Sequence, residues 1–531
     1  MLFRFIPSWS NHCIDYYPLH WEGATLRASR IELLRGSDMF RPTGIVRKND
    51  REYYFADWVS PSYELHSMGR LWKLEVDPDQ AKWLDPQAKP WTAEALLADR
   101  LRSGRELSDA ESSLDALFGW IDGGDEYLAD AAMTALGRIA KHWSTDQWQS
   151  LSPKRRANAL AAMRKEHLED PQWVQRMWND PDPEVRFEVL RWVSDSIWKE
   201  YLPKVEAMLD DPKLDYRLFE AALATVNTLT GKPAEGVTDA KMLIDKITHP
   251  QTPSRIPAFA LRLAPVSHDR LGVDTLRGLL ERKDQELTRE VVRTLALRKD
   301  PGSQRVLIEV IQDESRETSL RLDALAGLIG SSDPEARELV DRLVNSNDPS
   351  ICAEAKRVSE QSGWSPKKAD GESAKSSRSF REWIERLDSL EGKPDPDAGR
   401  RIFFHVAGAA CAQCHRYGGR GNVVGPDLSL VSKQGNRDEI LAAILEPNRE
   451  LAPQFYTTFL QLADGSDFSG ILLRSSSTEV YRNSFGQEVT FQKREIESRK
   501  ELPSSLMPSG LLDSMTDAQV RDLLAFLTQE P

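Results

Sequence analysis

The chain has 531 residues, of which 40% are hydrophobic and 29% charged, and its formal net charge is −13. This length exceeds what one hydrophobic core can hold and predicts about three or four domains. The acidic balance excludes a surface built for nucleic acid, which needs basic residues to neutralise phosphates. The sequence contains no uninterrupted run of roughly 18 apolar residues, so no membrane span is predicted.

The N-terminal sequence does not predict a signal peptide, and the cysteine content does not predict a disulfide scaffold. The first apolar run is cut by Arg4 and Pro7 and lacks a small-residue cleavage site, so no signal peptide is predicted. Four cysteines in this length do not make a disulfide framework. We interpret Cys13 and Cys352 as two separate thiols.

Residues 1–80 are predicted to be β-structure. Apolar and polar residues alternate in TLRASRIELL (25–34) and EYYFADWV (52–59), and SMGRLWKLEVD (67–77) ends the stretch as a further strand. So short a set of strands makes a poor independent domain unless it pairs with something else.

Residues 95–362 are predicted to be helical repeats. Acidic, often proline-containing turns precede apolar stripes with i, i+3, i+4, i+7 spacing, as in DPDPEVRFEVLRWV (180–193). Arginines at equivalent places, Arg186, Arg217, Arg289 and Arg321, are separated by 31, 72 and 32 residues. One helix pair of this size cannot bury its apolar face alone, so the pairs are expected to stack as a HEAT-like α-solenoid. The tryptophans of this region, Trp173, Trp178, Trp192 and Trp198, are expected to pack between helices.

Residues 363–393 are predicted to hold a linker and a short helix. The stretch SGWSPKKADGESAKSSRS (362–379) is small, charged and polar, with nothing to pack. FREWIERLDSL (380–390) follows as an amphipathic helix.

The last predicted domain, residues 394–531, contains the motif CAQCH, formed by Cys411, Cys414 and His415. C-x-x-C-H is expected by chance on the order of once in a thousand such chains, so the motif is informative. A zinc site would need four ligands, and only His405 is at hand to complete one. A redox disulfide would sit between a strand and a helix, whereas the preceding sequence is helical in pattern. Attachment of a c-type haem explains more of the residues, because two thiols three apart match its two vinyl groups and the next residue then lies under the iron.

Other residues of this domain fit such a haem. The Pro426 carbonyl, in GPDL, is placed to accept a hydrogen bond from the imidazole of His415. A sixth iron ligand is often methionine, and two candidates precede the amphipathic helix predicted at 516–529. Met515 has a structural role beside a Thr516–Gln519 capping box, whereas Met507 lies in a loop bounded by Pro and Gly, so Met507 is favoured. An insertion at about 453–500 alternates like four or five short strands and resembles a small Sm-like barrel.

Together the motifs GRRIFF, CAQCH, GPDL, ILEPNRELAPQF, SLMPSGLL and LLAFL resemble the haem-binding domain typical of planctomycetes and verrucomicrobia, over roughly residues 395–529. The resemblance implies thioether bonds at Cys411 and Cys414 and axial iron ligation by His415 and Met507. In that family HEAT repeats and a dehydrogenase-type β-propeller often precede the haem domain. Residues 36–77 look like the closing blade of that propeller, so we expect this chain to be the C-terminal part of a larger protein.

The fold expected is therefore multidomain and mainly α: a propeller-blade remnant, a HEAT-like α-solenoid and a cytochrome c-like domain with a small β-barrel-like insertion. The function expected is electron transfer through haem c, between a donor such as a dehydrogenase and an acceptor protein, with export from the cytoplasm implied by the haem. The chain by itself is not expected to be an enzyme, because the iron changes oxidation state without making substrate bonds. The alternative is a protein-binding HEAT scaffold, with a partner on the solenoid and a structural or gas- or redox-sensing haem domain.

Overall fold

The computed structural model describes residues 3–9, 11–49, 51–60, 66–77, 91–104, 113–140, 142–166, 171–231, 240–365, 378–405, 411–449, 451–502, 504–513 and 515–529. The chain divides into two compact units, Met1–Trp198 and Lys199–Pro531. Each unit is described by itself.

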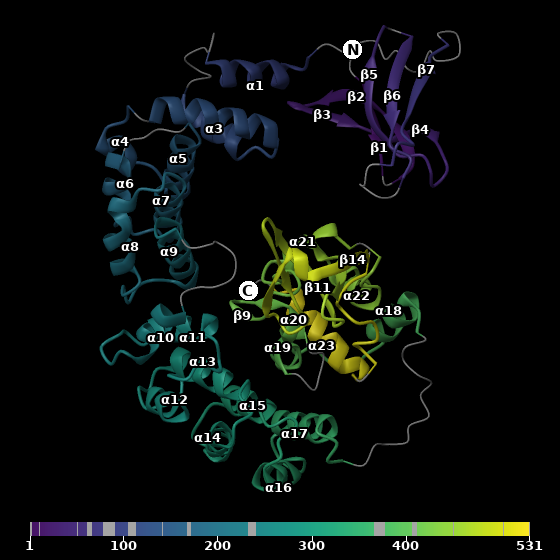
Figure 1. Cartoon of the computed structure of the whole chain (residues 1–531). Coiled ribbons are helices and arrows are strands. Elements are labelled where there is room, and N and C mark those ends of the chain that lie inside the picture. The colour runs from purple at the N-terminus through teal and green to yellow at the C-terminus, as the bar shows by residue number, and fades with distance from the viewer. Residues whose placement is uncertain are drawn as a thin grey trace. The chain divides into compact units, whose positions relative to one another are not determined.

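The first unit begins with two antiparallel sheets (Figure 1). The first contains β1 (Phe3–Ser8), β2 (Cys13–Glu22), β3 (Thr25–Ala28) and β4 (Ile31–Arg35), and the second contains β5 (Pro42–Arg47), β6 (Glu52–Asp57) and β7 (Arg70–Glu75). In β6 the alternation buries Tyr53 and Phe55, as expected for a strand with one face on a core. The strands predicted within 25–34, 52–59 and 67–77 are therefore confirmed.

Helices complete the first unit. They are α1 (Ala93–Ser103), α2 (Leu114–Ile121), α3 (Glu126–Ala140), α4 (Thr145–Gln149), α5 (Pro153–Lys165), α6 (Pro171–Met177) and α7 (Pro183–Asp195). Helix α1 contacts α3, α3 contacts α5, and α5 contacts α7. Trp173 and Trp192 are buried between helices as predicted, and Trp173 packs against Trp148 with the rings tilted and their centroids 4.8 Å apart. Trp178 and Trp198 are only half-buried.

The second unit continues with stacked helices. They are η2 (Lys199–Tyr201), α8 (Leu202–Met208), α9 (Tyr216–Leu229), α10 (Ala240–Thr248), α11 (Arg255–Leu263), α12 (Val273–Leu280), α13 (Gln285–Ala296), α14 (Pro301–Gln312), α15 (Thr318–Ala326), α16 (Pro334–Leu343) and α17 (Pro349–Gln361). One row runs α11–α13–α15–α17 and a second runs α12–α14–α16, with contacts along and between the rows. Two stacked rows of helices are the arrangement of an α-solenoid.

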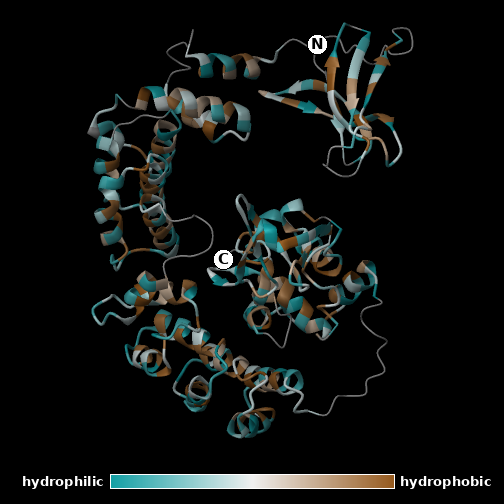
Figure 2. Ribbon diagram, in the orientation of Figure 1, coloured by the Kyte–Doolittle hydropathy of each residue, from teal (hydrophilic) through white to brown (hydrophobic). Residues whose placement is uncertain are grey.

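The acidic turns of the sequence have a local role in this stacking. The side chains of Asp300, Asp333 and Asp348 each accept a hydrogen bond from a backbone N–H of the following helix, and proline occupies the first turn of all three helices. A carboxylate oxygen satisfies an otherwise unpaired donor there, and proline lacks the donor that would need a partner. Figure 2 shows hydrophobic and hydrophilic residues interleaved along the helices, as amphipathic stacking requires.

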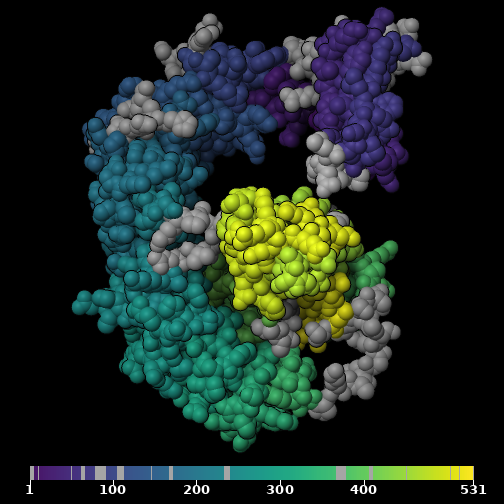
Figure 3. Space-filling model, viewed as in Figure 1, coloured from purple at the N-terminus to yellow at the C-terminus, as the bar shows by residue number. Residues whose placement is uncertain are grey.

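The C-terminal part of the second unit is a compact body, green to yellow in Figure 3. Its helices are α18 (Phe380–Asp388), α19 (Pro396–Phe404), α20 (Cys411–Cys414), α21 (Val431–Gln434), α22 (Arg437–Leu445) and α23 (Asp517–Leu527), with short turns η4 (Pro453–Phe455) and η5 (Lys493–Glu495). The helices predicted at 380–390 and 516–529 are confirmed, and α19 bears out the helical pattern of the sequence before the motif. Most of the predicted linker, residues 366–377, lies outside the described residues.

The terminal helices of this body cross at close range. A Cβ atom on Gly399 of α19 would collide with the backbone carbonyl of Asp522 in α23 and would lie 2.9 Å from Cβ of Phe526. The crossing therefore needs glycine at 399. Phe403, Phe526 and the fully buried Met515 belong to the core cluster that the two helices share.

The insertion forms a five-stranded antiparallel sheet. Its strands are β10 (Thr457–Leu462), β11 (Asp467–Ser475), β12 (Thr478–Arg482), β13 (Glu488–Gln492) and β14 (Ile496–Leu502), in the order β13-β12-β11-β10-β14. The last strand thus returns to pair with the first. A two-stranded hairpin, β8 (Arg416–Tyr417) and β9 (Arg420–Gly421), follows the Cys–His motif.

Candidate functional site

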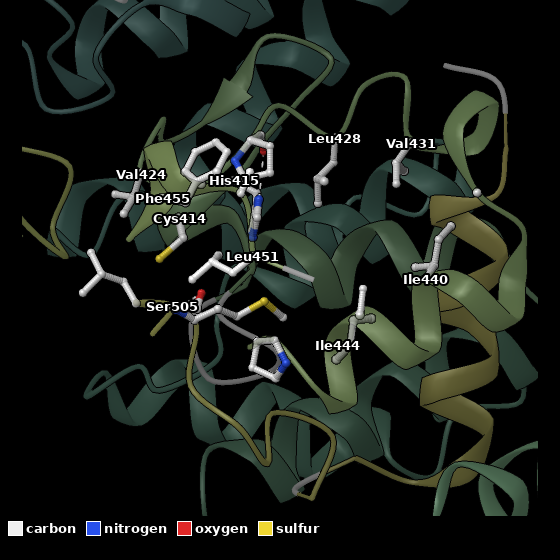
Figure 4. A pocket seen from close by; sticks show the side chains of 18 of the residues that line it. Cys414, His415, Val424, Leu428, Val431, Ile440, Ile444, Leu451, Phe455 and Ser505 are labelled. Carbon is white, nitrogen blue, oxygen red and sulfur yellow. Dashed lines mark hydrogen bonds between the residues drawn. The ribbon is translucent and has the colours of Figure 1, made fainter. Parts of the chain in front are cut away.

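A cavity of about 440 Å³ lies in the C-terminal body, and its wall is mostly apolar. The apolar lining residues include Val424, Leu428, Val431, Ile440, Ile444, Leu451, Phe455, Ile471 and Leu527. Figure 4 shows the side chains of Cys414 and His415 directed into this space, with Ile440 and Ile444 of α22 at another side. An apolar hollow with a few polar groups is the usual form of a site for a small molecule or cofactor.

His415 is held in one orientation by a backbone carbonyl. Its Nδ1 lies 2.8 Å from the oxygen of Pro426, the partner that the sequence predicts. Because a carbonyl only accepts, Nδ1 must donate, and Nε2 is left with its lone pair. Burial lowers the pKa of His415, and the opposing effects of the Pro426 bond and of Asp427 are smaller. The imidazole is therefore neutral at neutral pH, as a metal ligand must be.

A glycine closes over the imidazole of His415. The N–H of Gly425 donates to the carbonyl of Cys414 at 2.8 Å, which places its Cα against the ring. A Cβ atom at this position would lie 2.5 Å from Cε1 and 2.9 Å from Nδ1 of His415. Any larger residue must displace the ring, so Gly425 is part of the site for steric reasons.

The two cysteines of the motif occupy the ends of the single turn α20. The N–H of His415 donates to the carbonyl of Cys411 at 2.8 Å and continues this turn. Cys414 lines the cavity, whereas Cys411 packs against the core cluster and does not belong to the cavity wall. Burial raises the pKa of the Cys411 thiol to about 12 and also raises that of Cys414. Thiols whose pKa is raised in this way differ from the low-pKa thiolates of redox disulfide motifs.

Of the two candidate methionines, only Met507 lines the cavity. It lies in the loop between β14 and α23, where its N–H donates to the hydroxyl of Ser505 at 3.0 Å. Met515 is fully buried in the core cluster beside Val520. The capping box predicted for Thr516 and Gln519 is present at the start of α23.

His405 lies apart from the cavity that contains His415. It is buried at the end of α19, where it lines a small separate cavity with Arg400 and Arg420. Burial and the neighbouring cations, Arg357 first among them, lower its pKa well below the usual value. Within the described part of the chain, no three side chains among His, Cys, Asp and Glu converge as a metal site. The arrangement therefore lends no support to zinc coordination that includes His405.

The cavity wall formed by α22 and the residues after it was not predicted from the sequence. Ile440, Ala443, Ile444 and Pro447 all line the cavity. Their i, i+3, i+4, i+7 spacing in ILAAILEP is a helical stripe and could have identified this wall.

Comparisons with known proteins give no family for this chain. No protein-family model matches it. No curated protein matches it either. Among solved structures, human deoxyhypusine hydroxylase in complex with glycerol is similar at 14% identity, over 51% of this chain and 96% of that one, with a TM-score of 0.21. This likeness is too weak to support an argument about fold or function. None of the helices in the described residues is both long and apolar enough to cross a bilayer.

Proposed function

We propose that this chain is a c-type cytochrome that transfers electrons, with one haem in the cavity of the C-terminal body. The observation that carries the proposal is that Met507, distant from the motif in sequence, lines the same cavity as Cys414 and His415. A thioether and a neutral imidazole facing one apolar space are the two ligands that many electron-carrying haems use.

The residues of the cavity suit a planar apolar macrocycle. In this proposal Cys414, in the cavity wall, and Cys411, at the other end of α20, would hold the haem through thioether bonds, and Nε2 of His415 and the sulfur of Met507 would ligate its iron. Pro426 keeps Nδ1 of His415 occupied and thereby fixes the free nitrogen. The apolar wall would limit the access of water to a bound iron, which would favour simple electron transfer over reaction with small molecules. When bound, the haem supplies a one-electron couple.

The remaining parts of the chain extend this proposal. The two helix rows and the acidic, arginine-containing turns support a HEAT-type repeat, and the sheets of residues 3–77 support a relationship to a propeller blade. The motifs shared with the planctomycete and verrucomicrobial haem domain support an electron donor such as a dehydrogenase. Haem c is attached outside the cytoplasm, so we include export in the proposal.

The direct test is a reduced-minus-oxidised spectrum of the full chain, exported and produced with haem-ligation machinery. We expect the spectrum of a low-spin c-type haem that is reversibly reduced and does not bind carbon monoxide rapidly. A matched control is Cys352→Ala, since Cys352 lies in α17 and donates to the carbonyl of Val344 at 3.0 Å, away from the cavity. This variant should give the wild-type spectrum. A colourless protein contradicts the proposal, and rapid carbon monoxide binding favours a gas-sensing haem instead.

A further inference from the structure

The segment that bears His415 is one hydrogen-bonded body. The N–H of Asn422 donates to the carbonyl of Ala412 at 3.0 Å, and that of Gly425 donates to Cys414 at 2.8 Å. The Asn422 side chain also donates to the carbonyl of Gln413 at 2.9 Å. The β8–β9 hairpin is therefore tied to the Cys–His turn, and a displacement of the hairpin displaces His415.

One arginine of this hairpin is buried against the helical repeat. Arg420 is 6% exposed, and its Nε and Nη2 donate to the Glu290 carboxylate of α13 at 3.0 and 2.8 Å. Nη2 also lies 3.0 Å from the Glu290 carbonyl and 3.1 Å from the hydroxyl of Thr294. All of these partners belong to a single turn of α13. A guanidinium with a planar, fixed set of donors gives such a contact a defined orientation.

The tip of the same hairpin fits closely against two other helices. Gly419 has φ of +84°, and a Cβ atom there would collide with the hydroxyl of Tyr216 in α9 and lie 3.2 Å from Cδ2 of Leu263 in α11. Three helices of the repeat, α9, α11 and α13, thus contact the five residues directly after the Cys–His motif.

A second set of ion pairs holds α19, the helix that precedes the motif. Arg400 pairs with Asp323 of α15, and Nε of Arg401 lies 3.2 Å from the Glu354 carboxylate of α17. Glu354 and Arg401 are both 4% exposed at their side chains. The helical repeat therefore contacts the C-terminal body through α19, before the Cys–His motif in the sequence, and through the β8–β9 hairpin after it.

Buried ion pairs of this kind specify geometry more than they stabilise. The cost of removing both charges from water offsets most of their attraction, whereas removal of one partner leaves an uncompensated buried charge. Glu290 also lies 2.9 Å from Arg293 and 3.4 Å from Arg262, so its carboxylate forms ion pairs with three guanidinium groups. If Arg420 or Glu290 were replaced by an apolar residue, the β8–β9 hairpin could shift along α13, which the ion pair prevents.

We propose that Arg420 is a positioning residue for the haem site, through which α13 of the helical repeat fixes the place of His415. The repeat then supports His415 from outside the cavity and would influence the potential of a haem iron that His415 ligates. This inference rests on the proposed electron-transfer function, because it concerns the same site.

The test compares full-length Arg420→Gln, Arg420→Lys and Glu290→Gln with a matched control, Arg277→Gln. Arg277 forms an exposed bidentate pair with Glu309 at 2.6 and 2.9 Å on the same repeat. In the haem-free chain, amide hydrogen exchange at His415, Asn422 and Gly425 is measured. In the haem-loaded chain, the midpoint potential and the methionine–iron signature are measured.

We expect Arg420→Gln and Glu290→Gln to accelerate exchange at these three amides more than tenfold and to shift the potential. Arg420→Lys should restore part of both, and Arg277→Gln should change neither. Wild-type exchange and potential in both Arg420 variants would overturn the inference, and the lysine variant decides the matter if the glutamine variant does not fold. If no haem is attached, the proposed function fails, and the exchange of the haem-free chain still decides whether α13 supports His415.

Discussion

The segment from Cys411 to Leu428 has two faces of opposite chemistry. Toward the cavity it meets apolar side chains such as Ile440 and Phe455, with a hollow of about 440 Å³ between them. Toward the helical repeat it presents Arg420 to the buried carboxylate of Glu290, beside a second hollow of about 360 Å³ that Arg420 also lines. The charged side chains of the second face are paired within the protein, whereas the apolar side chains of the first face line the larger hollow. The contrast indicates that the charged face holds the segment in place and that the apolar face lines the candidate site.

The largest effect is expected when the two cysteines proposed to attach the haem are replaced. The double variant Cys411→Ala, Cys414→Ala should lose essentially all covalently attached haem, because no thiol remains on α20. Single variants should retain a fraction attached through one bond. Haem staining after denaturing electrophoresis measures both. Wild-type staining of the double variant would show that the attachment lies elsewhere.

The next effect tests the space beside His415. Gly425→Val places carbon atoms where the imidazole ring lies, since even a Cβ would be 2.5 Å from Cε1. We expect haem incorporation to fall by about tenfold or more. A tenfold change in a binding equilibrium corresponds to roughly 1.4 kcal/mol. Gly435→Ala is the control, because its nearest neighbour is the Glu439 carboxylate at 3.3 Å, at the rim of the same cavity. Equal incorporation in both variants would contradict the steric role of Gly425.

Substitution of the two methionines should have different effects, because Met507 is proposed to ligate the iron whereas Met515 packs in the core. Met507→Ala should abolish the methionine–iron signature with little change in the free energy of unfolding of the haem-free chain. Met515→Ala should keep that signature but lower this free energy by about 2–5 kcal/mol, since it removes a fully buried core side chain. Spectroscopy and denaturant titration distinguish the two outcomes. Loss of the signature in Met515→Ala alone would transfer the ligand role to Met515.

The smallest effect concerns the charged face and appears only in acid. Burial raises the pKa of Glu290, but the guanidinium groups of Arg420, Arg293 and Arg262 outweigh it and lower the pKa from 4.5 to about 2. A carboxyl group with a lowered pKa stabilises the native state above its unfolded value, and this contribution is lost as the pH falls from 4.5 toward 2.

The stability of the second unit should therefore decline in this pH window, with Asp323 and Glu354, whose pKa values are also lowered, contributing in the same direction. Thermal unfolding followed at several pH values measures the decline. Glu290→Gln should make it shallower, whereas Glu309→Gln, at an exposed pair, should leave it unchanged. A Glu290→Gln variant with the wild-type pH dependence would show that this carboxylate is not the titrating group.

The sequence predicted most local features for identifiable physical reasons. The Asp–Pro turns, the amphipathic helices and the Thr516–Gln519 box follow from hydrogen-bond donors and apolar stripes within a few residues. The Pro426 contact was also predictable, because a short rigid turn links it to His415.

Contacts between distant segments were not predictable in this way. Nothing near Arg420 in sequence marks Glu290 as its partner. The α22 wall lay in a recognisable helical stripe, yet its cavity depends on how β10–β14 and the Met507 loop fold back over it.

The most direct test of the central claim is the mass of the full chain, matured with haem-ligation machinery and measured under denaturing conditions. The account predicts a mass increased by one haem, retained after acid extraction and located on the peptide that contains Cys411 and Cys414. An unmodified mass for that peptide, in a preparation where a known c-type cytochrome is correctly loaded, would contradict it.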